Sequence, residues 1–184
     1  MSLVLGVIGE RSSGKDTLSQ YLVEKYRAFA ISHSKILDEI LNILDLPISR
    51  RNEIDLGMAL RSPFGEGVIA KALRKRVLQE TADIIVVQSI RFPHEVDNVK
   101  TLHGHLIFIE APLKVRYERA HKRQEKADDN ISFEQFQAMQ QEPTEIGIEA
   151  LKKDAEFVIS NDSTLEHLYQ QIDEVMHKLG KDKK

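Results

Sequence analysis

The 184-residue sequence contains no cysteine. Without thiols, the chain forms no disulfide, no thiolate zinc site and no cysteine nucleophile, and we expect a cytoplasmic location. Long apolar runs are also missing, since the run at 84–87 is far shorter than the roughly 20 residues that cross a membrane. We therefore expect no membrane association. We also expect no signal or transit peptide, because the first predicted strand begins almost at Met1.

An excess of positive charge is absent as well. The formal net charge is −3, whereas nucleic-acid-binding proteins present a basic face, so we expect no nucleic acid partner. The Asn-Lys-x-Asp signature of guanine recognition does not occur. The chain is 41% hydrophobic and lacks internal repeats, which predicts a single domain over residues 1–184, acting as a monomer or homodimer.

Apolar segments alternate with amphipathic ones along the chain. Strands are predicted at 3–8, 28–32, 83–89, 105–111 and 156–160. Helices are predicted at 15–27, 34–44, 50–60 and 66–80, from Pro93, from Pro112, and after capping boxes at Ser132 and Ser163. This alternation predicts the α/β class: a five-stranded parallel sheet flanked by helices, with ligands at the carboxyl ends of the strands.

A glycine-rich turn follows the first predicted strand. In "GERSSGKDT", Gly9, Gly14 and Lys15 have the spacing of a phosphate-binding loop, or P-loop. The glycines let backbone N–H groups turn toward one anion, and the helix near Lys15 adds its positive end. We expect ATP to be bound by the loop residues Gly9, Arg11, Ser12, Ser13, Gly14, Lys15, Asp16 and Thr17.

The residue after Lys15 is Asp16, where the P-loop pattern has Ser or Thr. One interpretation is a carboxylate favoured by the dipole of the first helical turn. The other is a water-mediated contact to Mg²⁺, with Thr17 supplying the hydroxyl one place late. Asp16 and Thr17 are therefore the candidate metal residues. The late threonine resembles that of adenylate kinases and points to small-molecule kinases.

Arginines occur where they could stabilise a transferred phosphoryl group. Arg61 precedes "SPFG", and Arg91 follows the third predicted strand. Arg116, Arg119 and Arg123 are three and four residues apart, so they share one face of a helix. A solvated helix carries such arginines routinely, but this one follows the fourth strand, at the mouth of the expected site.

The chain resembles three groups of P-loop kinase-like proteins over nearly its whole length. They are dephospho-CoA kinases, the archaeal adenylate-kinase-like P-loop proteins and phage deoxynucleoside monophosphate kinases. The stretches that carry the resemblance are "GERSSGKDT", "SHSKILDEIL", "QSIRFPHEV", "RFPHEVDNVKTLHGHLIFI", "IEAPLKVRYERAHKR" and "KKDAEFVISNDSTLEHL". The P-loop stretch is specific, whereas the others are individually weak but occur in the family order.

The resemblance implies roles for individual residues. Arg119 would lie near the adenine and phosphates of ATP, Arg123 would be a lid arginine, and both would join Lys15 in catalysis. Asn161 would lie near the adenine. Residues 124–143 would form a short helical lid, and residues 33–82 an acceptor-side helical insert. The residues implied to face a small-molecule acceptor are Ser34, Lys35, Arg61 and Arg91.

Two carboxylates of these families are missing. The stretch "AISHSK" after the second strand has none, and Gln88 and Ser89 stand where relatives carry Asp. Asp16, Asp38, Asp55 and Glu95 are the possible substitutes.

Other side chains leave alternatives open. His33 is a possible general base or a structural histidine. One interpretation of His103 and His105 is a pair of metal ligands, and the other is part of a turn. For Phe64 and Phe92 the alternatives are stacking on a substrate and packing in the core.

The sequence thus favours an ATP-dependent kinase acting on a small nucleotide-like acceptor, with Mg²⁺. The alternative is a regulatory P-loop module with little turnover, which the missing carboxylates favour and the arginine helix disfavours. An ATPase that hydrolyses ATP outright lacks a clear residue to position water.

Overall fold

The computed structural model describes residues 2–123, 131–142 and 144–181. Its centre is a parallel sheet of five strands in the order β2-β3-β1-β4-β5. The strands are β1 (Leu3–Ile8), β2 (Phe29–Ser32), β3 (Ile84–Ile90), β4 (His105–Glu110) and β5 (Phe157–Ser160). Because β1 is central and β3 and β4 flank it, the loop after β1 lies between the carboxyl ends of both neighbours.

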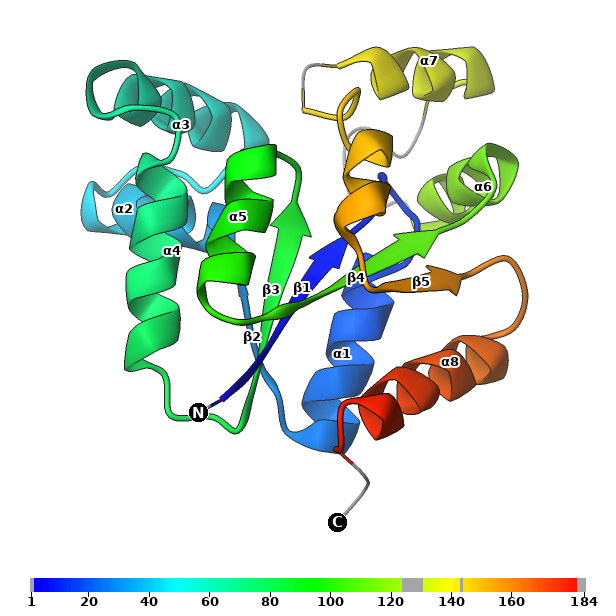
Figure 1. Cartoon of the computed structure of the whole chain (residues 1–184). Coiled ribbons are helices and arrows are strands. Elements are labelled where there is room, and N and C mark those ends of the chain that lie inside the picture. The colour runs from blue at the N-terminus through cyan, green and yellow to red at the C-terminus, as the bar shows by residue number, and fades with distance from the viewer. Residues whose placement is uncertain (1, 124–130, 143, 182–184) are drawn as a thin grey trace.

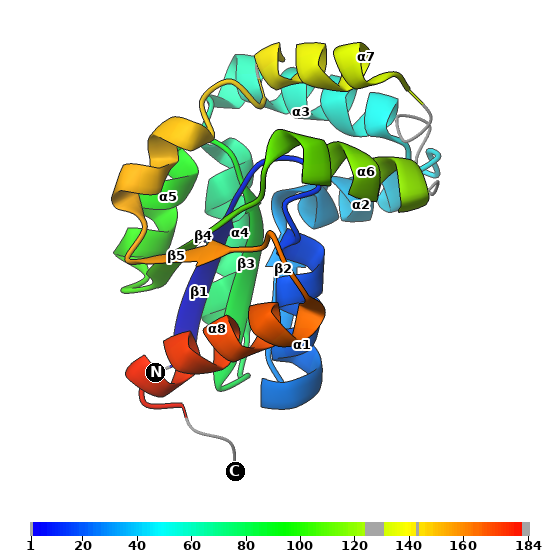
Figure 2. The same ribbon diagram turned by 90° about the vertical axis from the view of Figure 1, so that its right-hand side faces the viewer.

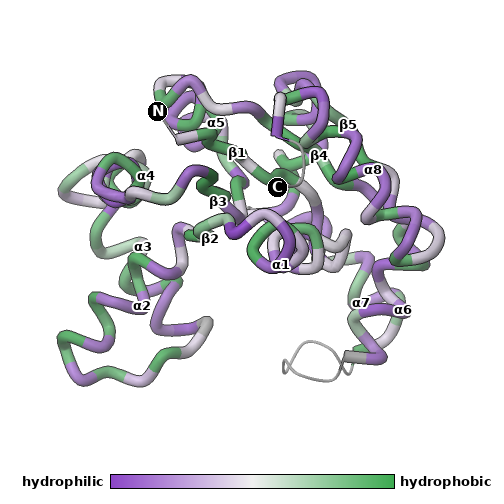
Figure 3. Tube along the Cα trace, turned by 90° about the horizontal axis from the view of Figure 1, so that it is seen from below, coloured by the Kyte–Doolittle hydropathy of each residue, from purple (hydrophilic) through white to green (hydrophobic). Residues whose placement is uncertain are grey.

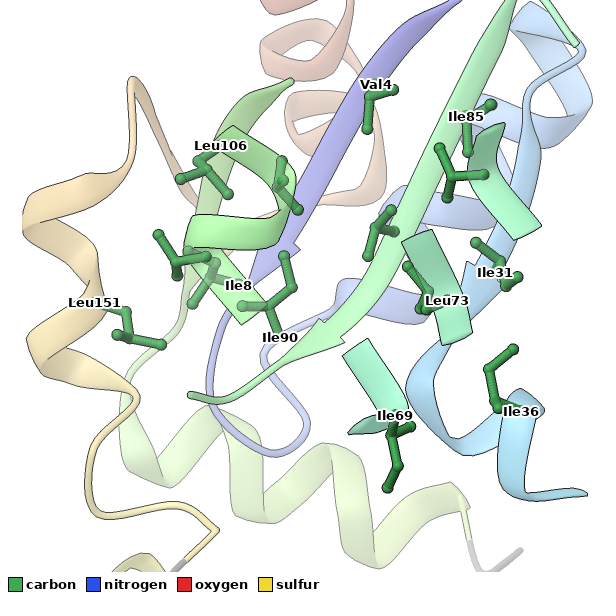
Figure 4. Close-up of a cluster of buried hydrophobic side chains, with 14 of the residues drawn as sticks. Val4, Ile8, Ile31, Ile36, Ile69, Leu73, Ile85, Ile90, Leu106 and Leu151 are labelled. Atoms are coloured by element: carbon green, nitrogen blue, oxygen red, sulfur yellow. The ribbon is translucent and has the colours of Figure 1, made fainter. Parts of the chain in front are cut away.

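Helices cover both faces of the sheet, as Figures 1 and 2 show. One face packs against α1 (Lys15–Tyr26) and α8 (Leu165–Lys178), whose Leu18, Leu22 and Ile172 are fully buried. The other face packs against α2 (His33–Ile43), α4 (Val68–Gln79), α5 (Pro93–Thr101) and the 3-10 helix η3 (Glu149–Asp154). Figure 4 shows this second core, in which Leu73 and Leu151 approach the strands. Apolar residues on both sides of each strand explain the continuous apolar runs in the sequence.

The remaining elements lie beyond the carboxyl ends of the strands. They are α3 (Arg50–Phe64), α6 (Leu113–Arg123), α7 (Phe133–Ala138) and the 3-10 helix η2 (Met139–Gln141). Figure 1 places α3 and α7 at the top, on either side of the strand ends. Viewed from below in Figure 3, α2 and α3 lie on one side of the apolar central strands, and α6 and α7 lie on the other. The carboxyl ends of the strands therefore lie between two groups of helices.

The predicted elements are confirmed with small shifts at their ends. The predicted capping box at Ser163 is wrong, because Thr164 is the N-cap of α8 and accepts a hydrogen bond from the His167 backbone. The predicted helix 50–60 extends to Phe64 as α3. The prediction that Phe64 packs in the core is also wrong, because its side chain is 66% exposed. Helix ends and exposure depend on neighbouring elements that the local pattern does not contain.

Candidate functional site

The loop between β1 and α1 is shaped by two glycines. A Cβ at Gly9 would lie 2.4 Å from the Ile109 carbonyl oxygen, and one at Gly14 would lie 2.1 Å from Asn161 Nδ2. Gly14 also has φ +110°, a conformation that only glycine adopts readily. Ser12, with φ 58°, is held in the left-handed region. The turn is thus packed against the ends of β4 and β5, and its backbone conformation fits a P-loop.

Lys15 begins α1, and its ammonium donates a hydrogen bond of 2.7 Å to the Glu10 carbonyl oxygen. The pKa of Lys15 falls to about 8, chiefly because burial disfavours its charge and also because the positive charge of Arg91 is close. A nearby anion would favour the charged form and so raise the pKa of Lys15 again. The lysine is therefore placed to gain from a phosphate group.

Asn161 links the end of β5 to this loop. Its Nδ2 donates to the Ser13 carbonyl oxygen at 2.8 Å, and its backbone N–H donates to the Glu110 carbonyl oxygen at 2.8 Å. Arg119 Nη2 in turn donates to Asn161 Oδ1 at 3.1 Å. The structure thereby brings together two residues, Arg119 and Asn161, that the sequence assigned to nucleotide binding on resemblance alone.

Several buried polar atoms around the loop have no hydrogen-bond partner in the described part of the chain. They include Ser12 Oγ, Ser13 Oγ and Arg119 Nη1. Leaving a buried donor unsatisfied costs about 1–3 kcal/mol, more for a charged group. Donors that remain unpaired beside a glycine loop and a helix N-terminus fit an anionic ligand such as a triphosphate.

Arg116 has a different role from Arg119. Its side chain is 4% exposed and donates to the carbonyl oxygens of Ala111 and Arg11, to Gln140 Oε1 and to Glu10 Oε1. These partners belong to the start of α6, the P-loop and η2. Arg116 therefore braces the loop against α6 and η2, which the arginine spacing alone did not reveal.

A buried carboxylate, Glu145, lies in the segment between η2 and η3. Its side chain is 2% exposed and forms an ion pair with Arg91, which also donates to the Thr144 carbonyl oxygen. The electrostatic influence of Glu145 reaches Lys15, Glu10 and Arg116. Sequence reasoning missed this residue, because its stretch "QEPTEIG" carries no motif.

The acceptor-side candidates lie around the start of α2 and the end of α3. Ser34 contacts the N-cap residue Ser32 at 3.0 Å between hydroxyl oxygens, and Lys35 is exposed in the same turn. Arg61 lies 5.9 Å from the centroid of the Phe92 ring and 3.9 Å from a Glu66 oxygen. Phe92 also stacks on His94, so it is not simply a core residue.

His33 and Glu95 are buried together on this side, with His33 Nε2 3.7 Å from Glu95 Oε1. Burial lowers the pKa of His33 to about 4 and raises that of Glu95. Glu95 accepts the backbone N–H groups of Arg91 and Phe92, so it caps α5. His33 is therefore uncharged near pH 7, and its low pKa makes it a weak base.

The residues expected to bind a metal were Asp16 and Thr17. Asp16 is exposed and Thr17 half-buried at the start of α1. Within the described ranges, no group of three or more His, Asp or Glu side chains could hold a metal ion by itself. Mg²⁺ in phosphoryl-transfer sites takes only one or two carboxylates, with phosphates and waters as its other ligands. The carboxylates near the P-loop fit that kind of site.

The histidines near β4 show no such arrangement. His103 lies in the turn after α5 with φ 53°, and His105 pairs with Glu156 at 2.7 Å. The turn interpretation therefore explains His103, and an ion pair explains His105.

The described part of the expected lid is residues 131–142, hereafter the lid segment. Phe136 is fully buried, and Tyr117 makes edge-on contacts with both Phe133 and Phe136. Arg11 contacts Met139 Sδ at 3.3 Å and Glu142 at 3.5 Å. Residues 124–130 and 143 of the expected lid and the Arg123 side chain lie outside the described part of the chain.

Residues 4–146 match the family described as an AAA domain. The chain belongs to the AAA domain family. A UPF0200 protein of Saccharolobus solfataricus is 28% identical over 181 residues, 97% of this AAA domain chain and 94% of the relative. A UPF0200 protein of Sulfurisphaera tokodaii is 28% identical over 182 residues, 97% of this chain and 99% of the relative.

Solved structures share the fold of this AAA domain. TT1252 from Thermus thermophilus has a TM-score of 0.64 and 19% identity, covering 97% of this chain and 98% of its own. Shikimate kinase from Acinetobacter baumannii has a TM-score of 0.63 and 13% identity, and the match covers 100% of this chain and 97% of the kinase. Dephospho-CoA kinase from Campylobacter jejuni has 0.56 and 18%, covering 98% of each chain. The predicted P-loop kinase-like fold is confirmed. Among the described residues, no helix is long and apolar enough to cross a membrane.

Proposed function

We propose that this AAA domain protein is an ATP-dependent phosphotransferase that acts on a small nucleotide-like acceptor in the cytoplasm. The observation that carries the proposal is the convergence of Lys15, Arg91 and Arg119 on a glycine loop with unpaired buried donors. Phosphoryl transfer needs positioning and positive charge more than covalent chemistry. A dephospho-CoA-type acceptor is supported by the dephospho-CoA kinase among the structural neighbours, and a nucleoside monophosphate by the resemblance of the sequence to phage deoxynucleoside monophosphate kinases.

Each group has a distinct task in this proposal. The backbone of residues 9–14 binds the β-phosphate, and Lys15 binds the β- and γ-phosphates. Arg119 and Asn161 hold the adenine side of ATP. When bound, Mg²⁺ neutralises charge on the β- and γ-phosphates. On the other side of the P-loop, Arg61 and Arg91 lie where they can orient an anionic acceptor, with Ser34 and Lys35 at the edge.

The test combines binding with product formation. We expect ATP with Mg²⁺ to raise the melting temperature of the wild type, because a ligand stabilises the state that it binds. Incubation with nucleosides, nucleoside monophosphates and dephospho-CoA should then yield one phosphorylated acceptor, detected by mass spectrometry. Lys15→Ala should lose both effects.

A regulatory P-loop module is the second candidate, because Gln88 and Ser89, near the end of β3, supply no carboxylate. Such a module predicts ATP binding with no phosphorylated product from the whole panel. If folded wild-type protein shows no stabilisation at saturating ATP and Mg²⁺, both candidates fail.

A further inference from the structure

Glu145 is a buried acid whose carboxylate is only half satisfied by the described residues. It follows η2 and precedes the buried residues Ile148 and Leu151, which anchor the segment in the core. One carboxylate oxygen, Oε1, pairs with Arg91, whereas Oε2 is buried and has no hydrogen-bond partner in the described part of the chain. A buried carboxylate oxygen without a partner is costly, so Oε2 is placed to contact a ligand.

The surroundings of Glu145 show where that ligand would lie. Arg91, its ion-pair partner, starts the turn after β3, immediately beyond Gln88 and Ser89. The charge of Glu145 also acts on Lys15 and on Glu10, the residue whose carbonyl oxygen accepts the Lys15 ammonium. Glu145 is thus at the phosphate end of the P-loop, although it comes from a different segment from the one that carries the acid in the resembling families.

Carboxylates lie among the cations of the site. Glu10, Glu145 and the exposed Glu149 act electrostatically on Arg116, and Glu145 also acts on Lys15. A bare triphosphate would therefore meet repulsion from Glu145 as well as attraction from the cations. A divalent cation placed between carboxylate and phosphates removes that repulsion. Carboxylate oxygens are the ligands that Mg²⁺ prefers in such sites.

We propose that Glu145 supplies the acidic group of the phosphoryl-transfer site that β3 lacks, and that it binds the Mg²⁺ of Mg-ATP directly or through a coordinated water. The inference rests on the proposed function, since it takes Mg-ATP to be the ligand. Arg91 holds the carboxylate in place through Oε1 and leaves Oε2 free for this contact.

The experiment measures how strongly Mg²⁺ and ATP assist each other. The dissociation constant of ATP is measured by calorimetry with Mg²⁺ and with EDTA, and their ratio is the coupling factor. In Glu145→Gln the oxygen that accepts from Arg91 remains, and only the charge is lost. We expect Mg²⁺ to tighten ATP binding about ten-fold or more in the wild type and less than about three-fold in Glu145→Gln. Glu145→Asp should keep part of the coupling.

Two control variants separate this role from others. Glu156→Gln removes an exposed carboxylate at the opposite ends of the strands, paired with His105, and should keep wild-type coupling. Arg91→Ala removes the anchor but leaves the carboxylate. Because Arg91 holds the carboxylate in place, Arg91→Ala should lose part of the coupling and Glu145→Gln nearly all of it. If Arg91→Ala loses more coupling than Glu145→Gln, the arginine rather than the carboxylate carries the coupling and the inference is wrong.

The remaining outcomes are equally decisive. Unchanged coupling in Glu145→Gln overturns the inference and leaves the proposed function intact. The inference is also wrong if Glu145→Gln binds ATP more tightly than the wild type by the same factor with and without Mg²⁺. The carboxylate would then be a counter-ion that ATP displaces. Absence of ATP binding by the folded wild type overturns the proposed function and this inference together. Circular dichroism and the unliganded melting temperature show whether each variant is folded.

Discussion

At the scale of single residues, the protonation of Lys15 links the site to pH. Its pKa of about 8 means that the free protein loses this charge as pH rises above 8. Phosphates raise the pKa of an adjacent ammonium, so ATP binding must take up a proton at pH values between the free and bound pKa. We predict that ATP affinity falls as pH rises from 8 to 10, by at most about ten-fold per unit. Calorimetry across that range measures this.

The control for this prediction is Lys15→Arg, since a guanidinium stays protonated throughout the range. Its ATP affinity is expected to be weaker overall and nearly constant with pH. An equally steep pH dependence in Lys15→Arg would assign the proton to another group.

Arg123 gives the most direct test of the catalytic hypothesis. It ends α6, one turn after Arg119. If it meets charge that develops only in the transition state, Arg123→Ala should lower turnover by roughly 10³-fold or more and weaken ATP binding far less. Lysine at this position should rescue only part of the rate. Steady-state kinetics and calorimetry on the same preparations decide, and a loss confined to ATP affinity would contradict the prediction.

At the scale of elements, one buried arginine ties three segments together. Arg116 donates to the P-loop, to the start of α6 and to Gln140 in the lid segment. In Arg116→Met these acceptors lose their donor, and the partly buried Glu10 loses its ion-pair partner. We expect the free energy of unfolding to fall by roughly 2–4 kcal/mol, measured by urea denaturation.

The matched control is Lys114→Met, which removes an exposed cation two residues earlier on α6. Its effect should stay within about 0.5 kcal/mol. Similar losses in the two variants would show that Arg116 contributes charge to the helix rather than a brace.

At the scale of the whole molecule, the lid segment contacts both α6 and the P-loop. It contacts the P-loop through Arg11 and is fixed by the buried Phe136. We propose that it moves as a lid, and we predict that ATP with Mg²⁺ changes hydrogen exchange in residues 131–142 more than in α8. Mass spectrometry of deuterium uptake measures both segments in one experiment. Identical uptake of the lid segment with and without bound nucleotide would rule out a lid.

Phe133 and Phe136 anchor the described part of the lid segment. Their burial depends on Tyr117, 16 and 19 positions earlier in the chain.

The sequence by itself determined the fold class, the strand positions and the P-loop. These depend on local patterns: apolar runs of strand length, helical periodicity, and glycines that no side chain could replace beside Ile109 and Asn161. It also placed Arg119 near Asn161, through resemblance.

Only the tertiary structure decided which charged groups meet. Arg91 and Glu145 are 54 residues apart and lie together because β3 and the segment before η3 end at the same edge of the sheet. Arg116 and Glu10 are 106 residues apart. Such pairs have no periodicity in the sequence, because each is fixed by the packing of whole elements. The sequence therefore shows that positions 88 and 89 carry no acid. Only the folded chain shows that Glu145 lies near the P-loop.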